Sequence, residues 1–412
     1  MTTHLFVAPG AAAFGEVLLG LRLARALHDR GDRVLFLAPR AFEVLLAPYP
    51  FAHGHSDAIA QVLDRALPDI VRDRRADTVT LLDLAVTLVA CQAYRLDPGF
   101  LARLGVPVIA LDIFDVGTGG GRRYDMGEVA IELGAVPDAP LRRIVPVPFA
   151  RPTTAAAYGV LGDGDVPTDE DRQRTRQGLG IGADEPLLVL VTAAFQGRGL
   201  SPFQVRLVDA MPALLAAQVA ALGPIRVVHV GPRALAGMGP RYRHLGQVAP
   251  AEFRRLIAAA DVLYTLNLSA TSVVTALEVD TPVVAAISSR RGPPDAAAHD
   301  SATVAAALAR LGPLYPFRVF PLGLHDFMAP VLVDNPYADA VTQVELFDEH
   351  ASVATLRALL FDGDARQAAR ARAARYRDQI RALPGAPLEV YSDQWTSVDR
   401  STDARGTGSI DS

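Results

Sequence analysis

The stretch from Asp261 to Ile287, DVLYTLNLSATSVVTALEVDTPVVAAI, decides the fold of this 412-residue chain. Its two apolar runs, Val262 to Leu266 and Val283 to Ile287, have the length and the β-branched content of buried parallel strands. The residues between the runs suffice for a loop, a short helix and a turn. The pattern therefore predicts a βαβ unit, the building block of an α/β protein with a parallel sheet.

The first connection of this unit, from Asn267 to Ser272, is rich in hydroxyl groups and also carries a carboxamide. Such residues cap helix starts, and the exposed amides and the dipole at a helix start favour an anion, typically a phosphate. Two interpretations follow from this pattern. The loop binds a phosphate group of a ligand, or its Ser and Thr residues serve only as the caps that any α/β protein needs.

Length and composition indicate a globular protein with two domains. The mass is 43.8 kDa, with 50% hydrophobic residues, 21% charged residues and a net charge of -5. No extended basic patch stands out, so nucleic acid is not an expected partner. No segment approaches the roughly 18 uninterrupted apolar residues of a membrane helix, and no signal-peptide pattern is present. We therefore expect a cytoplasmic protein without an integral membrane segment.

The chain contains no lysine, so its 40 basic residues are all arginine. This excludes the Schiff-base lysine of pyridoxal phosphate chemistry and the lysine of a P-loop. Cys91 is the lone cysteine, which excludes an internal disulfide. His53 and His55 could suggest a metal, but two histidines without a third ligand nearby are more often loop residues. No metal site is therefore predicted.

The first half opens with a strand from His4 to Gly10, a loop of small residues, a helix, and a second strand from Arg33 to Leu37. This order is typical of a doubly wound sheet. Gly10 and Gly15 bracket the loop but do not form the GxGxxG pattern, so a dinucleotide-binding site is not predicted.

Carboxylates follow two later strands of this half. Asp83 lies near the end of a strand predicted over Thr78 to Val86, and Asp112 and Asp115 follow the next one. Ligands of open α/β sheets bind beyond the carboxyl ends of the strands, so these carboxylates are candidates for chemistry. The alternative is that they are polar residues that simply end strands.

A second α/β array starts at Leu187, after a segment from Val145 to Pro186 in which proline, glycine and charge rise. Beyond it, Leu314 to Tyr337 is irregular and aromatic-rich, and Val353 to Leu383 is helical with a break near Asp362. The predicted fold class is α/β, with two Rossmann-like doubly wound domains that face each other across a cleft. The predicted divisions are 1–165, 166–350, helices over 351–396 that could return to the first domain, and a disordered tail over 397–412.

The second half resembles the GT-B glycosyltransferases, most closely the branch of the lipid II-forming N-acetylglucosaminyltransferase and the antibiotic glycosyltransferases. VTAAFQGRG, at 191–199, is similar to that branch's strand and GGSQGA loop. The residues from 244 to 286 follow the family's order of strand, helix, strand, phosphate-binding loop and turn. GEVLLGLRLA, at 15–24, is a weaker match to GHxxPxLxLA. The resemblance covers residues 4 to 385 in architecture, and its motifs are confined to 187–287.

This resemblance implies the GT-B fold and transfer of a sugar from a nucleotide-sugar donor of unknown base to a small-molecule acceptor in specialised metabolism. It implies that no metal is required, and the absence of lysine argues against pyridoxal phosphate. Glu16 falls on the family's catalytic histidine, and Asp83 falls on an aspartate that supports that histidine, with Asp115 as an alternative support. The donor and its phosphates are placed on Gln196, Gly197, Arg198, Asn267, Ser269, Thr271, Ser272 and Thr275.

The chain also departs from the family pattern. Thr275 replaces a glutamate that often holds the ribose, Asn267 replaces a histidine or arginine, and Asp280 stands where the turn glycine usually lies. Arg198 could restore positive charge opposite the loop. Two further hypotheses therefore stay open, namely a sugar-nucleotide epimerase or pseudo-glycosyltransferase, and a non-catalytic GT-B partner protein. Homodimer formation stays open as well.

Overall fold

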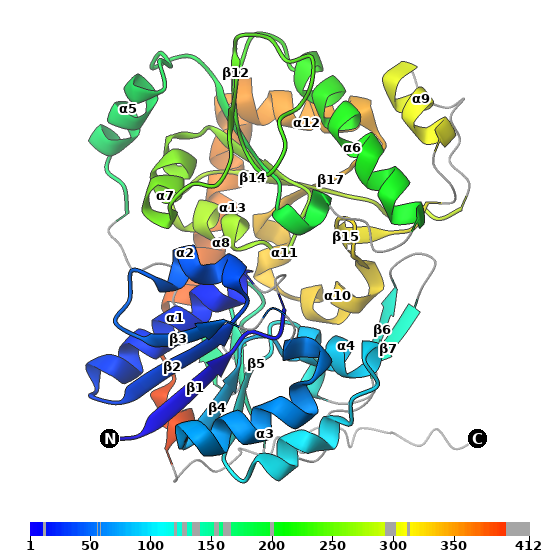
Figure 1. Ribbon diagram of the computed structural model, residues 1–412. Coiled ribbons are helices and arrows are strands. Elements are labelled where there is room, and N and C mark those ends of the chain that lie inside the picture. Colours follow the sequence, from blue (N-terminus) through cyan, green and yellow to red (C-terminus); the bar gives the residue numbers. More distant parts are fainter. Residues whose placement is uncertain are drawn as a thin grey trace, which may run out of the picture.

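The fold is α/β and has two halves, each built around its own sheet (Figure 1). The computed structural model describes residues 1–10, 14–55, 57, 59–118, 122–125, 130–133, 141–151, 156–159, 166–197, 202–292, 302–310 and 314–392. The predicted disordered tail, 397–412, lies outside these residues. None of the helices in the described ranges is long and apolar enough to cross a membrane.

The N-terminal sheet is parallel throughout and has the strand order β3-β2-β1-β4-β5-β8-β9. Every residue of β1, β4 and β5 is buried, as expected for parallel strands that are covered on both faces. The strands are β1 (Thr3–Val7), β2 (Arg33–Ala38), β3 (Ala52–His55), β4 (Thr78–Leu81), β5 (Val108–Leu111), β8 (Leu141–Pro146) and β9 (Ala157–Tyr158). His53 and His55 therefore lie on the edge strand β3, and their prediction as loop residues was wrong.

The helices of this half are α1 (Phe14–Asp29), α2 (Glu43–Leu46), α3 (Leu63–Arg74) and α4 (Leu84–Ala93), and a hairpin pairs β6 (Arg122–Asp125) with β7 (Ala130–Leu133). The strand predicted over Thr78 to Val86 was too long. It ends at Leu81, and Asp83 caps the helix that begins at Leu84, where its Oδ1 accepts a hydrogen bond of 2.8 Å from the Val86 N–H. An apolar run alone does not distinguish a buried strand from a buried helix.

The C-terminal sheet has the order β12-β11-β10-β13-β14-β17 and is also parallel. The strands are β10 (Leu187–Val191), β11 (Arg226–Val230), β12 (Tyr242–Leu245), β13 (Val262–Thr265), β14 (Val283–Ile287) and β17 (Thr342–Glu345). The predicted βαβ unit is confirmed as β13, the helix α8 (Thr271–Glu278) and β14, with Leu263 paired to Val283. β13 lies between β10 and β14, inside the sheet.

The other helices of this half are α5 (Asp169–Gly178), α6 (Pro202–Ala221), α7 (Pro250–Ala259), α9 (Ala302–Arg310), α10 (His325–Leu332), α11 (Pro336–Ala340), α12 (Glu349–Phe361) and α13 (Gly363–Arg381). The predicted break near Asp362 is confirmed, because this residue caps α13. The prediction of an irregular segment over Leu314 to Tyr337 was wrong. It contains α10, whose pattern is obscured by Pro330, and an antiparallel pair, β15 (Phe317–Val319) and β16 (Gly323–Leu324).

Asp280, in the turn between α8 and β14, has a positive φ of 62°. Aspartate is among the few residues other than glycine that adopt this left-handed conformation, which explains how the turn forms without the family's glycine. The Arg377 guanidinium contacts the Asp280 carboxylate and also donates to the Leu277 carbonyl oxygen. The turn is thereby attached to α13.

α13 connects the two halves. Figure 1 shows this orange-red helix running from the C-terminal half down to the N-terminal half. Near its end, the Tyr376 hydroxyl donates to the Pro148 carbonyl oxygen at 2.7 Å. The residues that follow α13 remain on the N-terminal half, where the Tyr391 hydroxyl lies 3.0 Å from the Thr80 Oγ1 and Arg142 donates to the Val390 carbonyl oxygen.

Replacing Tyr376 with alanine should lower the melting temperature markedly. The side chain is 1% exposed, and its ring packs against Tyr337 at 5.3 Å between centroids. Removing a buried aromatic side chain costs about 3–5 kcal/mol. Differential scanning calorimetry of Tyr376→Ala, with Tyr94→Ala as the exposed control, measures the change. A variant that melts with the wild type would contradict the inferred role of Tyr376.

Candidate functional site

The site lies where the carboxyl ends of the two sheets meet. Gly15 lies in the first turn of α1, and a Cβ atom placed on it would lie 2.6 Å from the Cγ2 of Thr271, the first residue of α8. Farther along the same edge, the Phe114 ring, beyond β5, packs against the Phe327 ring of α10 at 5.2 Å between centroids. The two halves therefore touch along the edges that carry the predicted site residues.

The N-terminal edge gathers three carboxylates, Glu16, Asp83 and Asp112. They follow β1, β4 and β5, which are neighbours in the sheet. Asp83 is 6% exposed and Asp112 is 1% exposed, so both are buried. Because β4 and β5 are paired in parallel, Asp83 and Asp112 lie at one edge of the sheet.

Glu16 retains partial exposure to solvent, yet burial is the main cause that raises its pKa, to about 8. The negative charge of Asp83 is the second cause of this rise, whereas the Glu16 backbone N–H acts to lower the pKa. Burial and the charge of Asp112 likewise raise the pKa of Asp83. The proximity of these groups favours keeping a proton on the cluster near neutral pH.

Asp115 has a different environment. Its carboxylate lies 2.9 Å from the Arg143 guanidinium, which also contacts Asp112 at 3.1 Å. Asp112 in turn accepts hydrogen bonds from the backbone N–H groups of Val116 and Gly117, at 2.8 and 2.9 Å. Asp83 is thus the carboxylate whose charge acts on Glu16, while Asp115 is paired with Arg143.

On the C-terminal half, the loop after β10 contains Gln196 and Gly197. Gln196 is 5% exposed, and its Oε1 accepts a hydrogen bond of 2.7 Å from the Ala193 N–H. Within the described residues, the Gln196 Nε2 is buried and has no hydrogen-bond partner. A buried amide donor without a hydrogen-bond acceptor costs free energy, and a ligand oxygen would accept its hydrogen bond. Arg198 lies outside the described residues.

The loop after β13 is arranged around Asn267. Its Oδ1 accepts hydrogen bonds from the Ser269 N–H at 2.9 Å and the Ser269 Oγ at 3.0 Å. The predicted capping of the helix by hydroxyl groups was wrong, because the N-cap of α8 is Ala270 and makes no side-chain capping bond. Thr271 and Ser272 instead form the first turn of α8.

Thr275 lies one turn into α8, and its hydroxyl donates to the Thr271 carbonyl oxygen at 3.0 Å. This side chain is shorter than the family's glutamate, and its hydroxyl proton is already used within the helix. Ser272 is 7% exposed, whereas Ser269, Thr271 and Thr275 are partly exposed. The structure thus brings Asn267, Ser269, Thr271, Ser272 and Thr275 together at one helix start.

A hydrogen-bond network next to the loop after β10 was not predicted from the sequence. The Tyr242 hydroxyl accepts from the Leu235 N–H at 2.8 Å and lies 2.8 Å from the His229 Nδ1. Its own proton is therefore available to that nitrogen, which leaves the His229 Nε2–H to donate to the Thr192 Oγ1 at 2.8 Å. Burial, with a smaller contribution from His244, lowers the pKa of His229 to about 4. The network fixes Thr192, just before the Gln196 loop, and its signal in the sequence was the histidine inside the buried run RVVHV.

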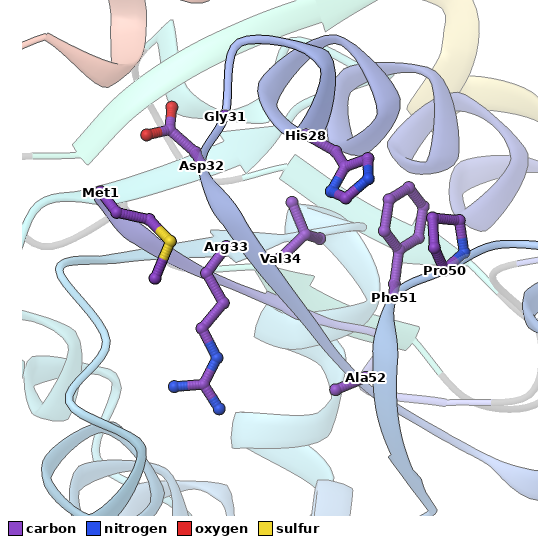
Figure 2. Close-up of a pocket in the computed structure, with 9 residues that line it drawn as sticks. All are labelled: Met1, His28, Gly31, Asp32, Arg33, Val34, Pro50, Phe51 and Ala52. Atoms are coloured by element: carbon purple, nitrogen blue, oxygen red, sulfur yellow. The ribbon is translucent and has the colours of Figure 1, made fainter.

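A hollow of about 350 Å³ lies at the amino ends of the strands in the N-terminal sheet, away from this site. Figure 2 shows it between Met1, His28, Arg33 and Phe51. None of the predicted site residues that the structure describes lines it.

Residues 23–392 match the model of the "Family of unknown function (DUF6365)". No curated protein matches.

Solved structures of similar fold include three glycosyltransferases. The glycosyltransferase SnogD from Streptomyces nogalater is 16% identical with a TM-score of 0.52, over 95% of this chain and 98% of that one. The spinosyn forosaminyltransferase SpnP is 16% identical with a TM-score of 0.55, over 93% and 96%. The glycosyltransferase VinC in complex with DTDP is 13% identical with a TM-score of 0.52, over 95% and 98%.

At these identities the likeness concerns the fold. Two parallel sheets are joined at their carboxyl edges. The C-terminal sheet has the 3-2-1-4-5-6 order of a doubly wound domain, and the N-terminal sheet has the same order with a seventh strand added at its end. The predicted fold class is therefore confirmed. The chain has the GT-B fold and belongs to the family of unknown function DUF6365.

Proposed function

We propose that this protein transfers a sugar from a nucleotide-sugar donor to the hydroxyl group of a small-molecule acceptor. The observation that carries the proposal is the contact of Gly15 with Thr271, which sets Glu16 beside the start of α8. A carboxylate of raised pKa on one half thus meets an anion-favouring helix start on the other. The fold shared with VinC, whose structure contains DTDP, supports a nucleotide as the donor group.

The donor diphosphate would lie at the start of α8. Because no side chain in the described ranges caps this helix, its first backbone N–H groups are available to phosphate oxygens. The hydroxyl groups of Ser269, Thr271 and Ser272 and the Gln196 amide would add further donors. These groups would stabilise the negative charge that develops on the leaving nucleoside diphosphate. Gly197, Asn267 and Thr275 would shape the loop and the ribose side of this site, and Arg198 would add a positive charge.

Glu16 would act as the general base. In the transfer step the acceptor oxygen forms a bond to the anomeric carbon of the sugar, and its proton passes to the Glu16 carboxylate. The bond from the anomeric carbon to the diphosphate oxygen breaks, and its electron pair leaves with the nucleoside diphosphate. A base is most effective when its pKa lies near the working pH, and the raised pKa of Glu16 satisfies this condition. No metal and no pyridoxal phosphate take part in this step.

Asp83 would support Glu16, since its charge is the electrostatic contribution that raises the pKa of Glu16. Asp115, the alternative support, would act through Arg143 and Asp112 instead. An acceptor from specialised metabolism is part of the proposal, because the similar structure SpnP bears the name of a spinosyn forosaminyltransferase.

The donor site can be tested by thermal-shift measurements with UDP, dTDP, GDP, ADP and CDP. A ligand that binds only the native state raises the melting temperature by mass action. We expect one of these nucleotides to raise it. Gln196→Glu keeps the oxygen that accepts from Ala193 but replaces the amide donor with a carboxylate, so the shift should disappear. Gln92→Glu, at an exposed position of α4, is the control. No shift with any nucleotide would refute the donor site.

The close approach of Gly15 to Thr271 predicts that a substitution of Thr271 restores the properties lost in a Gly15 variant. Gly15→Ala should lower the melting temperature and weaken the nucleotide-dependent shift, because the new Cβ meets the Thr271 Cγ2 at 2.6 Å. Adding Thr271→Ser removes that methyl group and keeps the hydroxyl, whose Oγ1 lies at 3.4 Å, so the double variant should recover both properties. Thr271→Ser alone is the control. A Gly15→Ala variant that behaves like the wild type would mean that the halves do not meet there.

Glu16 should make stability and turnover depend on pH in opposite ways. Its pKa is raised in the folded protein from 4.5 to about 8, so its stabilising contribution is present below about pH 4.5 and lost as pH rises through about 8. Glu16→Gln should therefore melt above the wild type at about pH 9 and much closer to it at about pH 5.5. Turnover requires the carboxylate, so the wild-type rate should rise over the same range.

Glu252→Gln changes an exposed glutamate in the first turn of α7 and is the matched control for both measurements. Glu16→Gln should also abolish release of nucleoside diphosphate in the presence of acceptors while it retains the nucleotide-dependent thermal shift. Unchanged turnover in this variant would remove Glu16 from the role of base.

A further inference from the structure

A cluster of Glu43, His53 and His55 lies at the outer edge of the N-terminal sheet. His53 and His55 stand two positions apart on the edge strand β3, so their side chains project from the same face. Glu43 is the first residue of α2, after the 3-10 helix of Arg40–Phe42. One potential ligand atom from each of the three side chains lies within 4.8 Å of the other two.

The contacts in this cluster converge on one carboxylate. The His53 Nε2 lies 3.2 Å from the Glu43 Oε1, and the His55 Nε2 lies 2.5 Å from the Glu43 Oε2. The Glu43 Oε2 is nevertheless buried and, within the described part of the chain, accepts no hydrogen bond of acceptable geometry. The two imidazole rings are 5.5 Å apart between centroids. A shared positive partner would satisfy all three side chains.

The hydrogen-bonding positions of His53 also favour a cation at this cluster. Its Nδ1 lies 3.3 Å from the Phe51 carbonyl oxygen, and its Nε2 faces the Glu43 carboxylate. A neutral imidazole carries one N–H, so it can donate to only one of these oxygens. With the proton on Nδ1, the Nε2 lone pair is free for a cation. A histidine that ligates a metal commonly donates its other N–H to a carbonyl oxygen in this way.

We propose that Glu43, His53 and His55 bind one divalent transition-metal ion of the zinc class. Two imidazole nitrogens and one carboxylate are a ligand set that zinc uses, with a fourth position left for water or another ligand. Nitrogen ligands disfavour Mg²⁺ and Ca²⁺, which prefer oxygen. The remaining alternative is that the histidines only form ion pairs with Glu43.

The position of the site suggests what the ion does. β3 is separated from β1 by β2, so the site lies apart from Glu16 and takes no part in the proposed sugar transfer. The ion would join α2 to the edge strand. A neighbouring contact joins the same segments, because the Asp57 carboxylate accepts from the Arg40 N–H at 2.9 Å. The ion is therefore expected to hold residues 40–46 in place against the edge strand of the sheet.

Calorimetric titration of the tag-free, chelator-treated protein with Zn²⁺ tests the proposal. One equivalent should bind, and the melting temperature should rise. His55→Ala and Glu43→Gln should each weaken binding at least about tenfold, since even partners outside the ligand set cost that much when removed. His350→Ala, at an exposed position of α12, should bind like the wild type. Co²⁺ in place of Zn²⁺ should give visible absorption bands that both ligand variants lose.

The metal-free melting temperatures separate loss of a ligand from loss of the fold. Variants that melt with the metal-free wild type but bind Zn²⁺ weakly would establish the site. If His55→Ala and Glu43→Gln melt lower without metal and Zn²⁺ does not stabilise the wild type, the cluster is an ion pair and the proposal is overturned. Binding that persists in a His53→Ala/His55→Ala variant would overturn it as well.

Discussion

The contact of Gly15 with Thr271 is the constraint on which the rest of the site depends. No side chain projects from Gly15, so α1 and α8 approach each other with their first turns in contact. The next residue along α1 is Glu16, and the residues next to Thr271 form the proposed anion site. Neither half holds both groups, and the chemistry we propose exists only because the two helix starts meet.

The sheets could be predicted from the sequence, because buried parallel strands appear as short apolar runs separated by helices. The unit from Asp261 to Ile287 shows this most clearly, since each of its elements was found in place. Element boundaries were harder to predict. The apolar run from Thr78 continues into α4 without a change in hydrophobicity, and only Asp83 marks the boundary. Pro330 similarly obscured α10, although the helix accommodates it.

The positions of site residues could be predicted from the sequence where strand order alone determines them. Parallel strands bring Asp83 and Asp112 to one edge whatever the side chains do. Contacts between residues distant in the sequence were not predictable in this way. The pairing of Asp115 with Arg143, the chain of hydrogen bonds from Tyr242 through His229 to Thr192, and the approach of Glu43 to His53 depend on side-chain packing. Local sequence patterns do not determine the distances between these side chains.

The path of α13 has a mechanical consequence. This helix contacts both halves, with Arg377 at the turn of α8 and Tyr376 at Pro148. In Figure 1, α13 lies to the left of α10 and of the β6–β7 hairpin. Halves attached through α13 cannot slide freely over each other, and their easiest relative motion is a rotation about this helix. Such a rotation would open the opposite side, where α10 meets the β6–β7 hairpin, and an acceptor would enter there.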